Sequence, residues 1–475
     1  MPVPNKDSEM YDALIIGAGM SGLVCGCYLA KAGMKVLIAE QHYKPGGYCS
    51  SFKRQGFTFD AAAHSFGSYR NGGNLNTVLK ELDLDKRIPI KRYDPTDIVV
   101  TPDYKIAFWI DHNKTIQELQ KAFPNETKIR DFITFMANPK PVDIAAMRKK
   151  TFKDLLTQYF ANDELMAILS FPLFGNGGLP PSLMSAFTGS KIFTEFVLDG
   201  GYYPDGGMQV LPDVLAKRFV ELGGTLLLSS TVRKITVRDN KISGVLFGKD
   251  NFVQSKYVIS NCDARRTFLK LLGRKIISEE LLDKLNNMTP TLSMFIIYLG
   301  IDKYFDVLPN PCSTVWFLPR YDIEDMYLDA KSKNKTDLTK YLLRVSPDGK
   351  AILAMSNTSF KNKQYWTANK YKLLDAFIKL IEQSTIPNLS EHIVYREAAT
   401  PYTLFRYTLN YMGAAYGWES TPEQFADPDL RKPSSISNLY LTGHWTTYVQ
   451  GIAGVVYLGY DTAKLIIRKE QKEKP

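Results

Sequence analysis

Three glycines and one acid near the start of the chain have the types and spacing that bind a dinucleotide. Gly17, Gly19 and Gly22 follow a short apolar strand and open a helix, and Glu40 comes about 20 residues later. The glycines permit the tight turn, the close approach of a pyrophosphate and the packing of the helix on the sheet. The N–H groups at the helix start, beside Ser21, favour phosphate, and the Glu40 carboxylate can accept hydrogen bonds from ribose hydroxyls. The alternative is a strand–helix–strand unit with glycines by chance.

The elements around these residues read as the start of a parallel α/β sheet. Residues 13–16 are an apolar run that enters the glycine motif, and residues 35–39 are a second run that ends at Glu40. An apolar helical stretch joins the two runs. Further expected strands are residues 225–228, 231–235, 241–246, 292–299, 313–317, 351–355 and 393–399, and a helix is expected near 371–383.

A second group of motifs carries a family resemblance. Pro45-Gly46-Gly47 is followed by the strand-like run 56–60, and the same order of motifs continues at 203–208, 258–261 and 400–417. In this order the chain resembles the polyene branch of the flavin amine-oxidase-like superfamily, which contains carotenoid desaturases, carotenoid cis–trans isomerases and retinol saturases. The resemblance implies an α/β fold, with a discontinuous Rossmann-type FAD-binding domain, an inserted α+β substrate domain and a helical subdomain.

The same resemblance implies FAD as a non-covalent cofactor. In the family, the backbone at the position of Val232 meets the adenine ring. One departure from the amine-oxidase side of the superfamily is Tyr48, which stands where those proteins usually have Arg. The cofactor-binding residues implied beyond the first motif are Gly46, Gly47, Val232, Gly443, Gly454 and Val455.

The resemblance also implies redox chemistry at a carbon–carbon bond of an apolar isoprenoid or polyene: desaturation, saturation or cis–trans isomerisation. The chain shows one dinucleotide fingerprint, so NAD(P)H is expected only as a diffusing reductant. The flavin carries the chemistry, while the protein supplies orientation and excludes water. Two other classes stay open, a flavin amine oxidase-like enzyme and a non-catalytic prenyl-lipid escort on the same fold. The complete set of FAD motifs argues against the escort.

Three residues are candidates for chemistry beside the flavin. His64 follows Asp60 by four positions, at the end of a strand that the family places near the flavin. It is a candidate acid/base, and the alternative is a hydrogen-bonded structural histidine. Arg406 and Tyr407 lie in the motif at 400–417 and are expected to shape the substrate tunnel.

The positions of the motifs predict three parts. Residues 8–75, 203–265 and 435–470 are expected to form the FAD-binding domain, and residues 76–115 and 266–434 the substrate-binding domain. Residues 116–202 form a helical subdomain that is a candidate for membrane contact, because apolar residues there stand beside basic ones. The alternative is a helix packed on the substrate domain. The residues in question are Phe152, Leu155, Leu156, Tyr159, Phe160, Ile192, Phe193, Phe196, Val197 and Leu198, with Lys149, Lys150, Lys153 and Lys191.

Composition limits the partners and the compartment. A net charge of +10 permits contact with nucleic acid or an anionic membrane, but Lys and Arg are scattered and no nucleic-acid fold motif occurs, so no nucleic-acid partner is expected. The five cysteines are dispersed and odd in number, which favours a reduced, cytoplasmic protein. The substrate class that the resemblance implies dissolves in bilayers, so a peripheral position on the inner face of a membrane is expected. The five histidines show no ligand spacing, so no metal site is expected. No oligomeric state is predicted.

Overall fold

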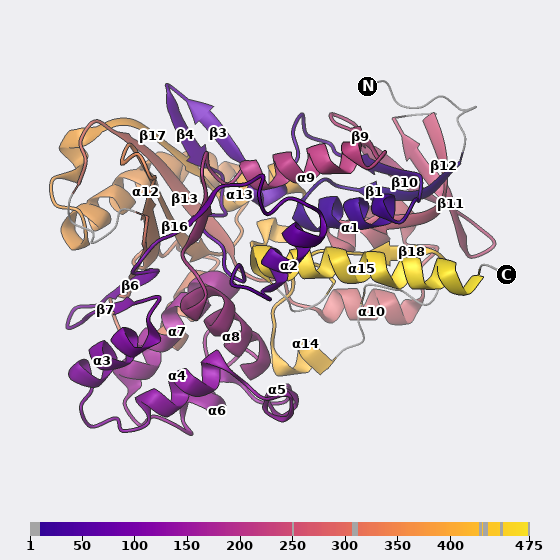
Figure 1. The fold of residues 1–475 in the computed structure, drawn as a ribbon. Coiled ribbons are helices and arrows are strands. Elements are labelled where there is room, and N and C mark those ends of the chain that lie inside the picture. The colour runs from indigo at the N-terminus through magenta and orange to yellow at the C-terminus, as the bar shows by residue number, and fades with distance from the viewer. Residues whose placement is uncertain are drawn as a thin grey trace.

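The computed structural model describes residues 10–248, 251–305, 312–426, 430, 436–446 and 450–473. The predicted domain limits at residues 8 and 435 lie outside these described residues. Two large sheets stand side by side, with the helices of the middle of the chain below the second sheet (Figure 1). The mixture of mainly parallel and antiparallel sheets with covering helices confirms the predicted α/β class.

The first sheet brings together strands from both ends and the middle of the chain. Five of its strands pair in parallel in the order β9, β2, β1, β12, β18. β11 and β10 extend it as antiparallel strands, joined by a turn at Asp239 and Asn240, whose φ values are 51° and 55°. The strands are β1 (Tyr11–Ile16), β2 (Val36–Ala39), β9 (Thr225–Leu227), β10 (Val232–Arg238), β11 (Lys241–Phe247), β12 (Asn251–Ser260) and β18 (Leu439–Leu441).

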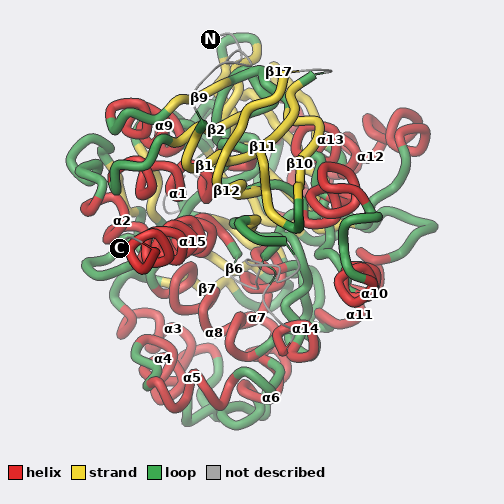
Figure 2. Tube along the Cα trace, turned by 90° about the vertical axis from the view of Figure 1, so that its right-hand side faces the viewer, coloured by secondary structure: helices red, strands yellow, loops and turns green. Residues whose placement is uncertain are grey.

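Four helices cover one face of this sheet: α1 (Met20–Lys31), α2 (Asn74–Glu81), α9 (Val210–Glu221) and α15 (Gly451–Glu473). Helix α1 packs against α9 and α15, and α2 packs on α15. Figure 2 shows α15 and α1 lying beside the strands of the sheet. Because α2 buries Val78 and Leu79 in this layer, the predicted domain limit at 75 cuts through a helix of the first domain.

The opposite face of the first sheet is covered by residues that we predicted to be part of the substrate domain. The turns of η3 (Arg266–Gly273) and helix α10 (Glu279–Asn287) bury Phe268, Leu272 and Leu285 against it. The predicted limit at 265 is therefore also too early, because the apolar face of the sheet needs a cover that these residues supply.

The second sheet has the order β17-β13-β16-β15-β14-β6-β7. Side chains alternate along β13: Phe295 and Ile297 pack toward helix α12 (Lys363–Ser384), while Met294 and Ile296 face the other way. The face that carries Met294 and Ile296, called the second face below, therefore points toward the rest of the molecule. The strands are β6 (Asp97–Val100), β7 (Lys105–Phe108), β13 (Ser293–Ile301), β14 (Thr314–Phe317), β15 (Tyr341–Val345), β16 (Ala351–Thr358) and β17 (Ile393–Ala399).

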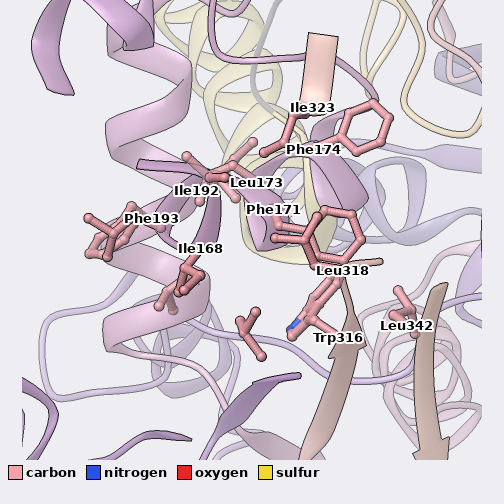
Figure 3. Packing of buried hydrophobic residues seen from close by; sticks show 14 of the residues in the cluster. Ile168, Phe171, Leu173, Phe174, Ile192, Phe193, Trp316, Leu318, Ile323 and Leu342 are labelled. Atoms are coloured by element: carbon pink, nitrogen blue, oxygen red, sulfur yellow. The ribbon is translucent and has the colours of Figure 1, made fainter. Parts of the chain in front are cut away.

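The helices between strands β7 and β8 form a separate helical layer. They are α3 (His112–Ala122), α4 (Ile129–Ala137), α5 (Pro141–Met147), α6 (Phe152–Leu156), α7 (Asp163–Gly177) and α8 (Ala186–Ile192). They pack on the second face of the sheet, where Phe171 and Phe174 of α7 lie near Trp316 of β14 (Figure 3). Helix α7 continues through Pro172 and Gly175 to its end at Gly177.

The apolar face that was a candidate for membrane contact is part of the core. Phe152, Leu156 and Phe193 are fully buried, and Phe160 and Val197 are nearly so. The alternative reading, a helix packed on the substrate domain, is therefore the correct one for these side chains. Among the described residues, no helix is both long enough and apolar enough to cross a membrane.

Short elements connect these layers. Strands β3 (Ser51–Arg54) and β4 (Phe57–Asp60) form a hairpin. Strands β5 (Ile90–Arg92) and β8 (Tyr202–Pro204), far apart in the chain, form a second antiparallel pair. The remaining helices are α11 (Ile323–Lys331), α13 (Pro401–Thr408) and α14 (Pro422–Ala426).

Candidate active site

The first glycine motif forms the turn between β1 and α1. Gly17 has φ +100°, and Gly19 is the N-cap of α1 without a side-chain cap, so the first N–H groups of the helix are free for a ligand. A Cβ at Gly22 would stand 2.2 Å from the Gly17 carbonyl oxygen. The turn is thus built for close backbone approach, which suits a pyrophosphate.

Glu40 follows β2 beside this turn. Its carboxylate is buried and accepts hydrogen bonds from the Ala18 N–H at 2.7 Å and the His42 N–H at 2.9 Å. Since a carboxylate has about four acceptor positions, two bonds orient it and leave capacity for ribose hydroxyls. The geometry suits the role expected from the sequence.

The loop at Gly46 and Gly47 lies against the same turn. The Gly46 N–H donates to the Ala18 carbonyl at 2.9 Å, and the two glycines have φ values of +124° and +59°. A Cβ on Gly47 would have the Gly19 Cα as its nearest neighbour, at 3.8 Å. Backbone alone therefore separates this loop from the phosphate turn.

The C-terminal motif, which contains the expected cofactor residues Gly443, Gly454 and Val455, reaches the same place through β18. Ser21 and Thr442 share a hydrogen bond of 2.7 Å between their hydroxyl oxygens. Gly443 has φ +86°, and a Cβ there would meet the Asn261 amide oxygen at 2.6 Å. The amide nitrogen of Asn261 in turn donates to the Gly17 carbonyl at 3.2 Å, so one side chain fastens both motifs.

One cavity of about 1100 Å³ joins these features. Every expected cofactor residue except Gly22 lines it: Gly17, Gly19, Ser21, Glu40, Gly46, Gly47, Val232, Gly443, Gly454 and Val455. Gly22 lies beneath the turn, where it lets α1 pack closely. The cavity therefore fits an adenine dinucleotide along the first sheet.

The other two layers line the rest of the cavity with apolar side chains and with some charged ones, among them Lys191, Glu195 and Glu397. The second sheet contributes Met294, Ile296, Tyr298 and Met355, and the helical layer contributes Phe187, Ile192 and Phe196. A cofactor site and an apolar chamber thus form a single space. That arrangement can hold an apolar substrate against a bound dinucleotide while excluding water.

The three candidate catalytic residues all line the cavity but lie in different surroundings. His64 is buried, and desolvation, followed by the positive charge of Arg344, lowers its pKa to about 3. It is therefore neutral at physiological pH, and its ring would hold an added proton only weakly. Arg406 and Tyr407 are exposed. The Tyr407 ring stacks on the His42 ring with 5.4 Å between their centroids. Arg406 and Tyr407 therefore lie on the side of the cavity where Glu40 is.

Sequence reasoning missed a buried polar network beside the C-terminal motif. The Asn410 amide nitrogen donates to the Tyr48 hydroxyl at 3.2 Å and lies 3.5 Å from His444 Nε2, while its oxygen accepts from Trp445 Nε1 at 2.9 Å. Burial lowers the pKa of His444 to about 4. Tyr48 and His444 both line the cavity, and Asn410 holds them in place. The departure at Tyr48 was a signal for this network, whereas nothing in the sequence marked Asn410.

Comparison with known proteins gives the family. A family model described as flavin containing amine oxidoreductase matches residues 20–467. The chain belongs to the flavin-containing amine oxidoreductases. It is an FAD-dependent oxidoreductase, as the motifs predict. Among the described residues, no group of three or more His, Cys, Asp or Glu side chains could hold a metal ion.

Relatives of this oxidoreductase agree with the predicted branch. It is 26% identical to an all-trans-retinol 13,14-reductase of Danio rerio, over 92% of this chain and 82% of the relative. It is 26% identical to a lycopene-forming phytoene desaturase of Pseudescherichia vulneris, over 97% of this chain and 100% of the relative. A chloroplastic prolycopene isomerase of an Oncidium hybrid cultivar is also 26% identical, over 96% of this chain and 83% of the relative.

Solved structures confirm the fold of this flavoenzyme. An oxidoreductase from Methanosarcina mazei superposes with a TM-score of 0.67 at 16% identity, covering 95% of this chain and 100% of that one. A putrescine oxidase bound to putrescine gives a TM-score of 0.63 at 16% identity, covering 97% and 99%. At such identities the likeness concerns the fold alone.

Proposed function

We propose that this protein carries out flavin-dependent redox chemistry at a carbon–carbon bond of an isoprenoid polyene. The observation that carries the proposal is the single cavity in which the cofactor residues of the first sheet continue into the apolar chamber of the second. The names of the relatives support it, because a retinol reductase, a phytoene desaturase and a prolycopene isomerase all act on polyenes.

Within this proposal the glycine turn binds the pyrophosphate of FAD, Glu40 binds the ribose, and the backbone at Val232 meets the adenine. Gly443, with Gly454 and Val455 beyond it, borders the flavin side. When bound, FAD accepts or supplies a hydride at the reacting bond. The chain's own contribution is to fix this cofactor, to hold the polyene in the apolar chamber and to exclude water.

His64 is proposed as the acid/base residue, because it is buried and part of the cavity wall. Arg406 and Tyr407 are proposed as cover for the cofactor near Glu40, since the Tyr407 ring stacks on His42 with 5.4 Å between the ring centroids. The variant His64→Asn should lower turnover without releasing FAD, whereas Tyr407→Ala should weaken FAD binding. If His64→Asn released FAD and Tyr407→Ala lowered turnover with FAD still bound, His64 would instead be a cofactor-binding residue and Tyr407 a residue of the reaction.

The test of the function is direct. The FAD-loaded protein is incubated with phytoene, with carotene isomers and with retinol, each with oxidised and with chemically reduced flavin, and the products are weighed by mass spectrometry. Loss of two hydrogens identifies a desaturase, and gain of two hydrogens identifies a saturase. An unchanged mass with altered double-bond geometry, seen only with reduced flavin, identifies an isomerase. Turnover of amines with peroxide release and none of polyenes would reject the proposal in favour of an amine oxidase.

We further propose that the open side of the cavity, rather than the helical layer, meets an anionic membrane. The lining includes exposed residues of two kinds, the aromatic Tyr43 and Tyr407 and the basic Arg54 and Arg406. Tyr43 is 70% exposed. The β3–β4 hairpin that carries Arg54 projects from the body of the molecule (Figure 1). Aromatic residues beside basic ones are typical of interfacial contact.

Flotation with liposomes tests this membrane contact. Binding to anionic vesicles should fall with added salt and with the double variant Arg54→Gln/Arg406→Gln. A matched control is Lys149→Gln/Lys153→Gln on the helical layer, which should leave binding unchanged. Equal loss in the two double variants would contradict the placement.

A further inference from the structure

A second, much smaller cavity lies directly behind the apolar chamber. It has a volume of about 10 Å³ and lies between helix α7 and strands β13 to β16. Met294 and Met355 line both cavities and so form the wall between them. Figure 3 shows Phe171 of α7, Trp316 of β14 and Leu342 of β15, which line the small cavity.

Two buried polar side chains reach this small cavity from neighbouring strands. Lys340 is 1% exposed and Asn357 is 5% exposed. The ammonium group of Lys340 donates to Asp337 Oδ2 at 3.0 Å, its one hydrogen-bond acceptor among the described residues. The amide nitrogen of Asn357 has no hydrogen-bond partner within the described part of the chain.

Unused donors at this depth are costly. An ammonium group has three N–H donors and an amide nitrogen has two, so most donors of Lys340 and Asn357 have no acceptor. Buried donors without a partner destabilise a protein, and such groups call for an explanation. A volume near 10 Å³ holds roughly one water-sized group, which is the size of a single oxygen.

We propose that the small cavity receives a carbonyl oxygen at one end of the substrate, so that the preferred substrate is an isoprenoid polyene with a terminal aldehyde or ketone. This inference rests on the proposed function. The donors call for an acceptor, and a carbonyl oxygen is an acceptor only. A carbonyl is preferred to a carboxylate because Asp337 already neutralises the charge of Lys340.

The wall between the cavities can yield to such a group. Methionine side chains are unbranched and flexible. On the paired strands β13 and β16, Met294 lies opposite Asn357 and Met355 lies opposite Ile296, so the two methionines are diagonal neighbours on one face of the sheet. Beside this wall, the Tyr416 hydroxyl donates to the Gly175 carbonyl at 2.9 Å. Tyr416 lines the large cavity and Gly175 the small one, so the polyene chain would run from the cofactor to α7.

The experiment compares two ligands that differ only in the end group. All-trans-retinal and its hydrocarbon counterpart, which lacks the oxygen, are titrated into the FAD-loaded protein, and dissociation constants are read from polyene absorbance. The aldehyde should bind about tenfold more tightly, as expected for one or two hydrogen bonds to buried donors. Trp316 lines the small cavity, so its emission should be quenched by the aldehyde, and the quenching should be lost in Trp316→Phe.

Asn357→Leu removes the amide donors at nearly constant volume. It should abolish the preference for the aldehyde and leave hydrocarbon binding unchanged. Thr358→Val is the matched control, because Thr358 is also buried and unpartnered on the same strand but does not line the small cavity. If Asn357→Leu does not fold, the paired replacement Lys340→Met/Asp337→Leu serves, since replacing a whole buried pair is tolerated better than breaking it.

Three results would overturn the inference while leaving the proposed function intact. The first is equal affinity for the two polyenes, and the second is an aldehyde preference that survives in Asn357→Leu. The third is a crystal structure of the aldehyde complex with only a trapped water between Lys340 and Asn357. Failure of the protein to bind or convert any polyene would instead reject the proposed function itself.

Discussion

The hydroxyl oxygens of Ser21 and Thr442 lie 2.7 Å apart, although 421 residues separate them in the chain. Ser21 stands in the first turn of α1, and Thr442 follows β18, which pairs in parallel with β12. A Cβ on Gly459 of α15 would stand 2.3 Å from the Ser21 carbonyl oxygen, so the last helix rests directly on the first. The cofactor site is complete only when the two ends of the chain have met.

Loss of this contact should affect both stability and cofactor binding. Ser21→Ala and Thr442→Val should each lower the free energy of unfolding by about 1 kcal/mol, and the double variant should cost less than the sum. Both should also weaken FAD binding. The matched control is the pair Ser260 and Thr267, which also share a 2.7 Å hydrogen bond but do not line the cavity. Denaturant unfolding measures the effect on stability, and FAD titration measures the effect on cofactor binding. Equal FAD affinity in the Ser21/Thr442 variants and the Ser260/Thr267 variants would contradict a link between the Ser21–Thr442 contact and cofactor binding.

Glu40→Ala should weaken FAD binding by about 1.5–3 kcal/mol, because a charged acceptor of the ribose hydroxyls is lost. Part of the loss reflects the turn itself, since the Ala18 and His42 N–H groups lose their acceptor as well. Fluorescence titration of FAD into apoprotein measures the change. The control is Glu221→Ala, because Glu221 of α9 forms an ion pair with Arg87 on the surface. This variant should bind FAD as the parent does. A Glu40→Ala protein with unchanged affinity would remove Glu40 from the site.

Gly22→Ala should prevent formation of the cofactor turn. The new Cβ would stand 2.2 Å from the Gly17 carbonyl oxygen and 2.9 Å from the Asn261 amide nitrogen, and neither can move without disturbing β1 or the C-terminal motif. We expect a colourless protein with a lowered melting temperature. Gly33→Asn is the control, because the space around Gly33 is open and Asn tolerates its φ of +83°. A yellow Gly22→Ala protein would show that α1 can shift.

The sequence predicted the parts of the site that rest on local backbone chemistry. Gly17 and Gly46 have positive φ, and Glu40 stands at the end of a strand; fixed sequence motifs reveal such positions. The predicted strands of both sheets lie within a few residues of the observed ones. The family prediction is confirmed. What the motifs did not reveal is packing: η3 and α10 cover the first sheet, and Phe152 is buried.

These misses have a common physical cause. An amphipathic segment beside lysines has the same sequence pattern whether its apolar face meets lipid or another helix, and only the tertiary structure decides. Asn410 was missed because its role depends on contacts with Tyr48, His444 and Trp445, three residues far from it in the chain. Such a network has no spacing that a motif can capture.

Two buried histidines predict how stability depends on pH. Burial lowers the pKa of His64 to about 3 and that of His444 to about 4, against about 6.5 when unfolded. Between these values the unfolded chain binds a proton that the native protein does not, so stability falls as the pH drops below 6.5. From pH 7 to 5, each histidine should remove up to about 2 kcal/mol of unfolding free energy.

Replacing either histidine should therefore flatten the pH profile. In His64→Gln and His444→Gln, the loss of stability between pH 7 and pH 5 should shrink, even if the variants are less stable at pH 7. His112→Gln is the control, because His112 is half-buried on α3 and does not line the cavity. Denaturant unfolding at both pH values measures the change. A steeper fall in His64→Gln than in the parent would mean that His64 is charged in the native protein, and it would then be available as a proton donor to the substrate.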